Sequence, residues 1–548
     1  VATGTETRHW RGGARAAQSL AFSPDGKTLA SNTIYDGSIR LWDVTTGRER
    51  HPSEGHHGNV GTLRFAADKG TLISIGLDQQ VLRWDQATQT PRRCFAWRTD
   101  SAGRVALSPD GNTLAVYDYG KTHEVRLWNV RTGKPDRVLG KARENLWVIA
   151  FSPDGRLVAA GGDERVIHVW DVREGKEVRR IEGVDHRVMR LCFSPDGKAL
   201  ACGMDPQGDA GSEPTLRLWD VASGKELRSF ARRACVGSLA FSPEGKVMAS
   251  GDGDWGGRSD LGGQSEASVR LWDTTTGKEL CQHSMPGSTE VRAVAFSPDG
   301  KLIASGGART KDSSVHLWEA ATGRLIRRFR GHHSGVWAVA FAADGLTVAS
   351  GAGDSTILLW DITGRRKDGQ LRGAALTPRE LETCWNNLAG ADAAKAYDAV
   401  WALVAAPEHA LPFLAKHLRP APPPDAKIIA RLLADLDSDN LSVRQRAMKE
   451  LGKFGGAIAP ALRRTLEGKP SLEVRRRVQQ LLDQKCDWTP ERLREHRAIQ
   501  ALEHIGTQQA KEVLKNLAAG APDTFRTEEV KAALQRILNP MFTSPSAK

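Results

Sequence analysis

Short stretches of alternating apolar and polar residues recur through roughly the first two thirds of the chain. Two of them are Ser268–Trp272 and Val291–Phe296. A period of two is typical of half-buried β-strands. Between the stretches stand turns of the type Ser-Pro-Asp-Gly, in which Pro presets φ and Gly takes the positive φ. The pattern therefore predicts many short antiparallel strands joined by tight turns.

The same unit occurs eight times. Each copy has a Phe-like anchor before the turn and a Trp followed by Asp, Asn or Glu. The Phe-like anchors are Phe22, Phe65, Leu107, Phe151, Phe193, Phe241, Phe296 and Phe341, and the Trp anchors are Trp42, Trp84, Trp128, Trp170, Trp219, Trp272, Trp318 and Trp360. A period of about 42 residues with several strands in each copy predicts four-stranded blades around an axis.

The spacing of the anchors separates a rigid part from a variable part. From each Trp to the next Phe-like anchor the distance is 22 to 24 residues, whereas from a Phe-like anchor to its Trp it runs from 19 to 31. The extra length falls between the second and third strands of three consecutive copies, in Gly203–Thr215, Gly251–Ser268 and Gly306–Ser314. We expect these loops to form one raised rim, where functional variation concentrates.

These motifs make the chain resemble the WD40-repeat family, in particular multidomain bacterial WD40 proteins. The resemblance covers about two thirds of the chain. It implies an all-β propeller of eight four-stranded blades over residues 1–363, with the long loops on the face where the innermost strands begin. It also implies protein partners.

The family resemblance further implies buried Asp-His-Ser/Thr-Trp networks within blades. Two copies match this network in full, with His56, Ser74, Asp78 and Trp84 in one and His332, Ser350, Asp354 and Trp360 in the other. Because the residues recur where the repeat dictates, they indicate structural tetrads rather than a Ser-His-Asp hydrolase. The other copies lose the His, the Ser or both, as at Val184 and Ala160, and we expect these blades to be held more by packing.

The N-terminal residues continue the repeat. Val1–Gly4 aligns with Val44–Gly47, which places an expected Trp-Asp pair before Val1. We therefore expect a truncated repeat, with an upstream blade, a signal peptide or a further domain left open. Thr5–Trp10 is expected to be an outer strand that completes the last blade.

Candidate partner-binding residues stand four positions before each Phe-like anchor. These positions, expected to ring the mouth of the central channel, hold Gln18, Gly61, Gly103, Trp147, Met189, Gly237, Arg292 and Trp337. Trp, Met and Arg are enriched at interfaces. The candidates are therefore Trp147, Met189, Arg292 and Trp337, together with Trp255 on the longest loop. The alternative, of about equal weight, is that each Trp packs between blades.

The sequence gives little support for a nucleotide-binding, metal-binding or catalytic site. Gly251–Gly256 matches G-x-G-x-x-G, but no helix follows to hold a pyrophosphate. The loop residues Asp205, Asp209, Asp252, Asp254 and Asp260 lack EF-hand spacing and are expected to be solvated. Seven Cys show no zinc-ligand spacing, and neither H-E-x-x-H nor G-x-S-x-G occurs. We expect no catalysis, no cofactor and no metal.

The pattern changes after Asp361, where Leu and Ala recur with a period of 3.6. Thr377–Glu380 is a capping box, so we expect a linker over residues 364–376 and an α-helical domain over 377–548. Ser442–Leu451 with Ala459–Arg464, and Arg494–Gly506 with Ala510–Ala518, are similar to HEAT-type helical repeats, though the signal is weak. Stacked helix pairs offer surfaces to other proteins.

The net charge of +12 is shared by both parts of the chain. Arg463, Arg464 and Arg475–Arg477 are interleaved with Glu467, Glu473 and Asp483, which favours a solvated helix face over a nucleic-acid site. No apolar run approaches the roughly 18 residues of a membrane span. Unpaired Cys favours the cytoplasm without establishing it.

The sequence therefore predicts a monomeric propeller with a helical-repeat domain that serves as a protein–protein interaction scaffold without catalytic activity. One alternative is the sensor or docking region of a larger signalling enzyme, such as a kinase whose catalytic domain precedes Val1. A second alternative is a nucleic-acid-associated scaffold.

Overall fold

A computed structural model describes most of the chain, in two compact units, residues 1–364 and 365–548. The described residues are 6–11, 17–23, 25–33, 39–46, 49–51, 60–65, 71–76, 80–85, 91–96, 102–118, 122–205, 215–230, 235–252, 267–285, 288, 290–308, 313–342, 344–352, 356–367, 370–371, 373, 375–468, 470–483 and 488–538.

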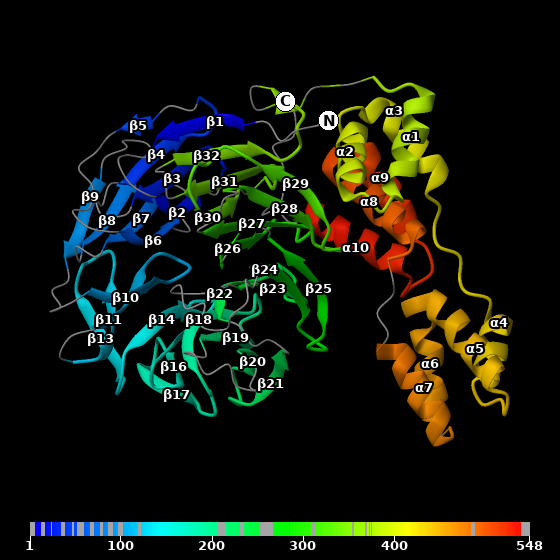
Figure 1. The fold of residues 1–548 in the computed structure, drawn as a ribbon, viewed down its shortest axis with the longest axis horizontal. Coiled ribbons are helices and arrows are strands. Elements are labelled where there is room, and N and C mark those ends of the chain that lie inside the picture. The colour runs from blue at the N-terminus through cyan, green and yellow to red at the C-terminus, as the bar shows by residue number, and fades with distance from the viewer. Residues whose placement is uncertain are drawn as a thin grey trace. The chain divides into compact units, whose positions relative to one another are not determined.

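The described part of the first unit contains eight four-stranded antiparallel sheets, each resembling a blade (Figure 1). Their first strands are β2 (Ala17–Phe22), β6 (Val60–Phe65), β10 (Ala102–Leu107), β14 (Leu146–Phe151), β18 (Arg187–Phe193), β22 (Val236–Phe241), β26 (Glu290–Phe296) and β30 (Val336–Phe341). The second strands are β3 (Thr28–Thr33), β7 (Thr71–Gly76), β11 (Thr113–Asp118), β15 (Leu157–Gly162), β19 (Ala199–Asp205), β23 (Val247–Asp252), β27 (Leu302–Ala308) and β31 (Thr347–Ala352).

Two further strands complete each sheet. The third strands are β4 (Ile39–Asp43), β8 (Gln80–Asp85), β12 (Glu124–Asn129), β16 (Ile167–Asp171), β20 (Leu216–Asp220), β24 (Ser268–Asp273), β28 (Val315–Glu319) and β32 (Thr356–Asp361). The outer strands are β5 (Glu49–His51), β9 (Pro91–Ala96), β13 (Pro135–Lys141), β17 (Lys176–Ile181), β21 (Glu226–Phe230), β25 (Glu279–Ser284), β29 (Leu325–Phe329) and β1 (Glu6–Arg11).

The N-terminal strand β1 belongs to the last sheet, although it comes first in the sequence. β1 pairs antiparallel with β32, so that Trp10 lies opposite Ile357, and it supplies the fourth strand of the last sheet. The outer strand predicted at Thr5–Trp10 is therefore confirmed. Each first strand contacts the first strand of the next sheet, and β30 of the last sheet contacts β2 of the first. The inner strands thus follow one another around a closed circuit.

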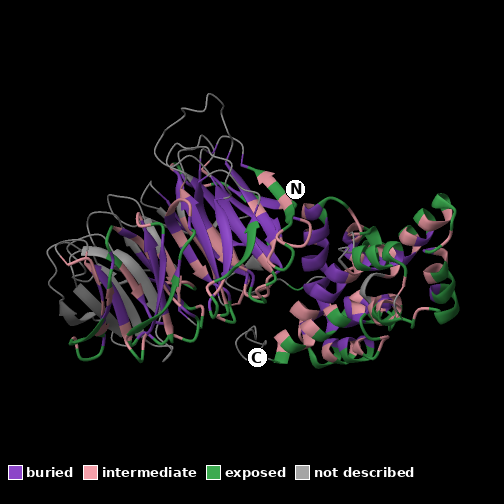
Figure 2. Cartoon of the chain, turned by 90° about the horizontal axis from the view of Figure 1, so that it is seen from below, coloured by how far each residue is buried: buried purple, intermediate pink, exposed green. Residues whose placement is uncertain are grey.

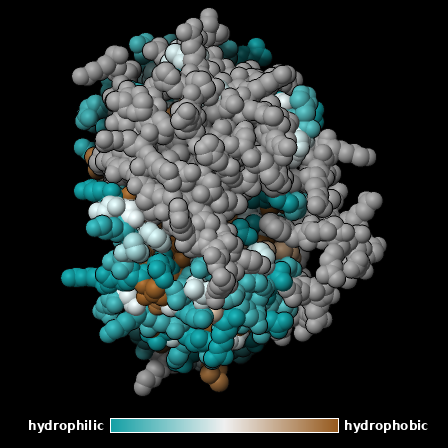
Figure 3. Space-filling view, turned by 90° about the vertical axis from the view of Figure 1, so that its left-hand side faces the viewer, coloured by the Kyte–Doolittle hydropathy of each residue, from teal (hydrophilic) through white to brown (hydrophobic). Residues whose placement is uncertain are grey.

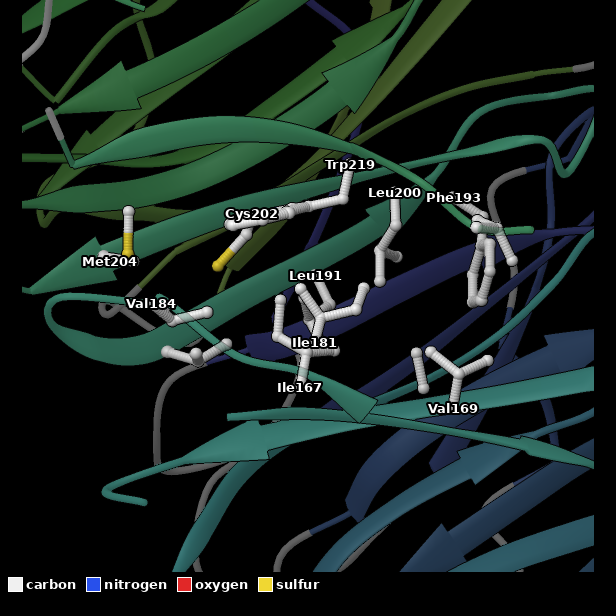
Figure 4. Packing of buried hydrophobic residues seen from close by; sticks show 13 residues of the cluster. Ile167, Val169, Ile181, Val184, Leu191, Phe193, Leu200, Cys202, Met204 and Trp219 are labelled. Atoms are coloured by element: carbon white, nitrogen blue, oxygen red, sulfur yellow. The ribbon is translucent and has the colours of Figure 1, made fainter. Parts of the chain in front are cut away.

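Neighbouring sheets pack through buried apolar side chains. In one cluster Ile167 and Val169 of β16 lie with Leu191 and Phe193 of β18, and Figure 4 shows the labelled side chains meeting between two sheets. The strand interiors are correspondingly buried (Figure 2). The described surface visible in Figure 3 is mostly hydrophilic. The exposed large apolar residues of the described chain are Val138, Val178, Leu227, Leu280, Ile428, Leu441, Leu472 and Leu538.

Glycines in the second strands allow the sheets to approach closely. A Cβ added to Gly161 would lie 2.7 Å from Val188 Cγ1, and one added to Gly306 would lie 2.4 Å from Val336 Cγ1. In both cases the valine belongs to the first strand of the next sheet. Because Cβ atoms essentially never approach so closely, these positions require Gly. Gly203 and Gly251 lie in the same way against Val236 and Val291.

One end of the sheets carries the Ser-Pro-Asp-Gly turns, and we call it the turn end. Ser152 Oγ accepts a hydrogen bond from Leu157 N at 2.9 Å and donates one to Asp154 Oδ1 at 2.5 Å. The Ser152 hydroxyl lowers the pKa of Asp154 below its usual 3.8. Gly155 takes φ +73°, as the turn requires. The serine bonds recur at Ser23, Ser108, Ser194 and Ser297.

Arginines on the outer strands join neighbouring sheets at the turn end. Arg228 Nε donates to Thr275 O at 2.8 Å, and Arg327 to Ile362 O at 3.2 Å. Arg137 and Arg179 make the equivalent bonds to Arg173 O and Ala222 O. These four arginines stand nine residues after a Trp anchor. The repeated side chains of the turn end therefore bond both within and between sheets.

The second unit is helical in its described part. Its helices are α1 (Pro378–Leu388), α2 (Ala393–Val404), α3 (Pro407–His417), α4 (Ala426–Asp435), α5 (Leu441–Phe454), α6 (Ala459–Glu467), α7 (Leu472–Asp483), α8 (Pro490–Ile505), α9 (Gln508–Ala518) and α10 (Phe525–Leu538). A short hairpin of β33 (Arg366–Lys367) and β34 (Gln370–Leu371) precedes them, and the 3-10 turn η1 (Gly455–Ile458) links α5 to α6. The capping box predicted at Thr377–Glu380 is confirmed at the start of α1.

Helix α8 organises part of this unit. It contacts α1, α2, α3, α9 and α10. Its Arg497 is 1% exposed and donates to Leu388 O at 2.7 Å and Gly390 O at 2.8 Å, which caps the C-terminal end of α1. Helices α4 to α7 pack around a separate apolar core that includes Leu436, Leu451 and Val478. The predicted helices are present, whereas their likeness to HEAT repeats stays a prediction.

Candidate functional site

Every first strand has a β-bulge near its start, at the end of the sheets opposite the turns. In β14, Leu146 pairs with Gly162 and Val148 with Gly161, which leaves Trp147 between them without a partner in the ladder. A bulge bends the strand and re-aims the side chain of the extra residue. The other bulges contain Gln18, Gly61, Met189, Gly237, Arg292 and Trp337, and the one in β10 spans residues 103–104. We call this end the bulge end.

The bulge end coincides with the positions that the sequence singled out, four residues before each Phe-like anchor. The long insertions also begin there, because Arg187 at the start of β18 pairs with Asp205 at the end of β19, and Val236 pairs with Asp252. The loop residues 206–214, 253–266 and 309–312, among them Trp255, lie outside the described residues. The side chain of Trp337 also lies outside them.

Trp147 is the best-defined side chain of the bulge end. It is half-buried, and its indole N–H donates to Asp163 Oδ1 at 2.9 Å. Arg187 Nε, from β18, lies 2.6 Å from the same Asp163 oxygen. The guanidinium groups of Arg104 and Arg187 lie 5.6 Å and 5.3 Å from the centroid of the Trp147 ring. Trp147 therefore contacts both neighbouring sheets while keeping part of its surface exposed.

Met189 departs from the expectation of an exposed anchor. It is only 7% exposed, so that expectation is wrong for this residue. An unbranched apolar side chain gains from such burial. The backbone at this bulge orients the next residue: Arg190 donates from one terminal nitrogen to Met189 O at 2.8 Å and from Nε to Gly237 O at 2.9 Å.

Arg292 is oriented by an acidic residue of its own strand. Its Nε and a terminal nitrogen lie 2.8 Å and 2.7 Å from Glu290 Oε1. The Glu290 side chain is 1% exposed and that of Arg292 19% exposed. A buried carboxylate thus holds a partly exposed guanidinium at the start of β26, which fixes the orientation of Arg292.

The charges of these strands act on one another. Burial lowers the pKa of Arg190, the Cys235 thiol and Glu290 carboxyl oppose this shift, and the positive charges of Arg104 and Arg292 add to it. Arg104 lies on β10, Arg190 on β18 and Arg292 on β26. We call the group formed by Arg104, Trp147, Asp163, Arg187, Arg190, Glu290 and Arg292 the arginine cluster.

Sequence reasoning named only Trp147 and Arg292 of this cluster. Arg104 and Arg190 each stand three residues before a Phe-like anchor, directly beside the position that was examined. Five of the other copies hold Ser, Thr or Ala at this position and one holds Val. A large cation among small residues at one register position is the signal that would have found them.

The buried polar network of the last sheet is structural. His332 Nε2 and Ser350 Oγ are 2.7 Å apart, and the Trp360 indole N–H donates to the same hydroxyl at 2.7 Å. Ser350 is 0% exposed, so no substrate reaches it. Asp354, His56 and Asp78, and the side chains of Ser74 and Trp84, lie outside the described residues.

The other sheets keep more of this network than expected. Trp42 donates to Ser31 at 2.9 Å, and the same bond is 2.8 Å long between Trp272 and Ser250 and between Trp318 and Ser305. These sheets therefore keep the Trp–Ser part of the network in addition to their packing. The serine stands nine residues after the Phe-like anchor, where pairing between the second and third strands brings it near the indole.

The described residues contain no group of three or more His, Cys, Asp or Glu that is arranged to hold a metal ion. Asp252 was expected to be a solvated loop residue, but it is 3% exposed and accepts a hydrogen bond from Ser268 Oγ at 2.7 Å. It therefore stabilises the start of β24. Among the described helices, none has the length and apolar composition that crossing a membrane requires.

Comparison with known families identifies the repeats. The family model "WD domain, G-beta repeat" matches six segments, residues 4–43, 133–171, 175–220, 224–273, 279–319 and 323–361. The second sheet and most of the third lie outside these matches. The sequences of these two copies depart from the repeat, with Phe65-Ala-Ala-Asp-Lys in place of Phe-Ser-Pro-Asp-Gly in one and Leu107 in place of the Phe anchor in the other.

Several curated proteins are similar over short segments. The guanine nucleotide-binding protein subunit beta of Schizosaccharomyces pombe is 28% identical over 102 residues, which is 19% of this chain and 32% of that protein. Nuclear distribution protein PAC1 of Arthroderma benhamiae is 32% identical over 142 residues, 23% of this chain and 30% of that protein. Cell division cycle 20.5, cofactor of APC complex, of Arabidopsis thaliana is 30% identical over 132 residues, 24% and 26% of the two chains. The chain thus spans about a third or less of these relatives.

A solved structure is similar over a larger part of the chain. The computationally designed Ika8 protein has a TM-score of 0.53 and 26% sequence identity, and the match covers 66% of this chain and all (100%) of that one.

Proposed function

Because this chain carries six WD40 repeats, we propose that residues 1–363 form an eight-bladed propeller that acts as a protein–protein interaction scaffold without catalytic activity. The eight sheets and the closed circuit of their inner strands support this architecture. Residues 364–376 link the propeller to a HEAT-like helical domain over residues 377–548. Completion of the last sheet by β1 of the same chain supports a monomeric propeller.

One observation carries the function. The bulge recurs in all eight first strands, but the residue at its centre changes from Gly to partly exposed Trp147 and Arg292 and to Met189, which is buried. A constant backbone that displays variable side chains provides a preorganised surface, which lowers the ordering cost of binding. We therefore assign partner binding to the bulge end, through Trp147, Arg292 and Trp337.

The names of the relatives support the scaffold role. One is a subunit of a guanine nucleotide-binding protein and another is a cofactor of the APC complex. The helical unit offers a second surface, because paired helices such as α8 and α9 present grooves to other proteins.

Affinity capture with the whole chain tests the function. The double variant Trp147→Ala/Trp337→Ala is compared with Val178→Ala/Leu227→Ala, which removes two exposed apolar side chains near the turn end. We expect specific partners to be lost with the first variant and retained with the second. Retention of every partner by the first variant contradicts the assignment to the bulge end.

A further inference from the structure

We propose that helices α6 and α7 of the helical unit bind the phosphate backbone of a nucleic-acid duplex through four exposed arginines, which are Arg463, Arg464, Arg475 and Arg476. This inference goes beyond the proposed scaffold function, which assigns protein partners. The sequence alone favoured a solvated helix face, because acidic residues are interleaved with these arginines. The contacts made by those acidic residues change that balance.

The interleaved glutamates leave the four arginines without an acidic partner. Glu473 Oε1 pairs with Arg477 at 2.6 Å, and Arg477 also donates to Leu436 O at 2.8 Å. Glu467 is exposed on α6, and the side chain of Asp483 lies outside the described residues. Within the described part of the chain, no ion pair or hydrogen bond joins any of the four arginines to a carboxylate. Their guanidinium groups can therefore bind phosphate oxygens without first breaking an ion pair.

The helical period turns these arginines away from the apolar core. Leu462 of α6 and Val474 of α7 are buried in the core that α4 to α7 share. Arg464 and Arg476 each stand two residues further along the chain. At about 100° per residue, this places both on the side of their helix opposite the core. The two arginines thus face solvent from neighbouring helices.

The arginines also cluster near the turn between the two helices. Helices α6 and α7 contact each other and are joined by residues 468–471 alone (Figure 1). Arg464 and Arg475 lie four residues from the near end of this link, and Arg463 and Arg476 lie five residues from it. With a rise of about 1.5 Å per residue, all four lie within about 8 Å of the link along their helices. They therefore form one compact basic surface.

Helix α5, which contacts α7, adds to the positive charge. Lys453 pairs with Glu450 at 2.6 Å and lowers the pKa of that carboxyl, and the positive charges of Lys449 and Arg446 lower it further. Arg446 and Lys449 are both exposed. The surroundings of α6 and α7 are consequently basic as well, which raises the local concentration of a polyanion.

The composition of α6 and α7 favours a duplex over a single strand or an acidic protein. Neither helix contains Trp, Tyr, Phe or His. A single strand is held largely by stacking of its bases on aromatic side chains, and protein interfaces are commonly centred on buried aromatic side chains. The backbone of a duplex needs only positive charge and hydrogen-bond donors, which the four arginines and the exposed amide of Gln480 supply.

Fluorescence anisotropy with the full chain and a short labelled DNA duplex of arbitrary sequence tests the proposal. We expect binding at about 50 mM salt. Four phosphate contacts release their counterions, so the affinity should fall on the order of a hundredfold when the salt is raised to about 200 mM.

The key variant is Arg464→Gln/Arg476→Gln, which changes two solvent-facing residues and leaves the core intact. We expect the affinity for the duplex at about 50 mM salt to fall about tenfold, and the slope of log affinity against log salt to fall by about two. The matched control Arg379→Gln/Lys416→Gln removes two charges at exposed positions of α1 and α3, and its affinity should stay within about twofold of the wild-type value. Far-UV circular dichroism checks that both variants keep the wild-type helix content.

Three results overturn the proposal. The first is no binding of the duplex at about 50 mM salt, and the second is equal weakening by the two double variants. The third is tighter binding of a single strand of the same length, or of polyglutamate, than of the duplex. None of these results bears on partner capture at the bulge end, which depends on Trp147 and Trp337.

Discussion

The two ends of the same inner strands differ in what repeats. At the turn end both backbone and side chains recur, as Ser152, Asp154 and Gly155 show in one copy. At the bulge end only the backbone recurs, and the side chain at one register position is Trp147 in β14 and Arg292 in β26. The turn end therefore uses its side chains to hold the fold, whereas the side chains of the bulge end differ from sheet to sheet, as the proposed recognition surface requires.

The largest expected loss of stability concerns the close packing of the sheets near the bulge end, whose backbone recurs as regularly as that of the turn end. Gly306→Val places atoms within 2.4 Å of Val336, and we expect it to lower the free energy of unfolding by about 3 kcal/mol or more. Urea unfolding measures this. Gly373→Val is the control, since a Cβ there meets nothing within 4 Å. Equal stability of the two variants would contradict the close packing of the sheets.

Next in size are the buried serines that receive Trp indoles. Ser350→Ala removes the partner of both Trp360 and His332, whereas Ser250→Ala removes a hydrogen bond from Trp272. We expect the free energy of unfolding to fall by about 2 kcal/mol in Ser350→Ala and by about 1 kcal/mol in Ser250→Ala, because each buried polar group that loses its partner destabilises the folded state. Thermal unfolding of the two variants compares them. A larger loss of stability in Ser250→Ala than in Ser350→Ala would contradict the role of Ser350 as a partner of both Trp360 and His332.

A smaller, pH-dependent effect is expected at the turn end. Ser152 lowers the pKa of Asp154 below 3.8, so the ionised carboxylate stabilises the fold above that pH. This contribution is lost as pH falls through the lowered pKa of the folded state. Ser152→Ala should lower the free energy of unfolding by about 1 kcal/mol at neutral pH. This difference in stability from the wild type should become smaller as the pH falls below about 3.8.

Urea unfolding at pH 7 and pH 3 measures this gap. Arg131→Ala, which changes an exposed turn residue outside the Ser-Asp pair, is the control. A gap that widens in acid would show that the Asp154 carboxylate does not stabilise the turn.

The smallest effect on stability is expected for a candidate site residue. Trp147→Phe keeps an aromatic ring under Arg104 and Arg187 and removes the hydrogen bond to Asp163. We expect the free energy of unfolding to change by no more than about 1 kcal/mol. The same substitution in the core, Trp360→Phe, should lower the free energy of unfolding more, because Trp360 is 0% exposed. A larger loss at Trp147 would make it a structural residue and weaken the comparison.

Local patterns explain why much of the fold was predictable. Alternating residues, Ser-Pro-Asp-Gly turns and the capping box at Thr377 each act over a few neighbours, and the structure contains them. The bulge positions followed from their distance to the Phe-like anchors. The arginine cluster did not, because Arg104 and Arg292 act on the pKa of Arg190 from other sheets, which local sequence patterns do not reveal. The burial of Met189 likewise depends on neighbouring strands that periodicity does not describe.

Site-specific photo-crosslinking tests the central claim most directly. A photoreactive phenylalanine analogue is placed in the whole chain either at position 147, in the bulge of β14, or at position 156, an exposed residue at the turn end of the same sheet. The account predicts that partner proteins crosslink from position 147 and not from position 156. Crosslinking mainly from position 156 would contradict it.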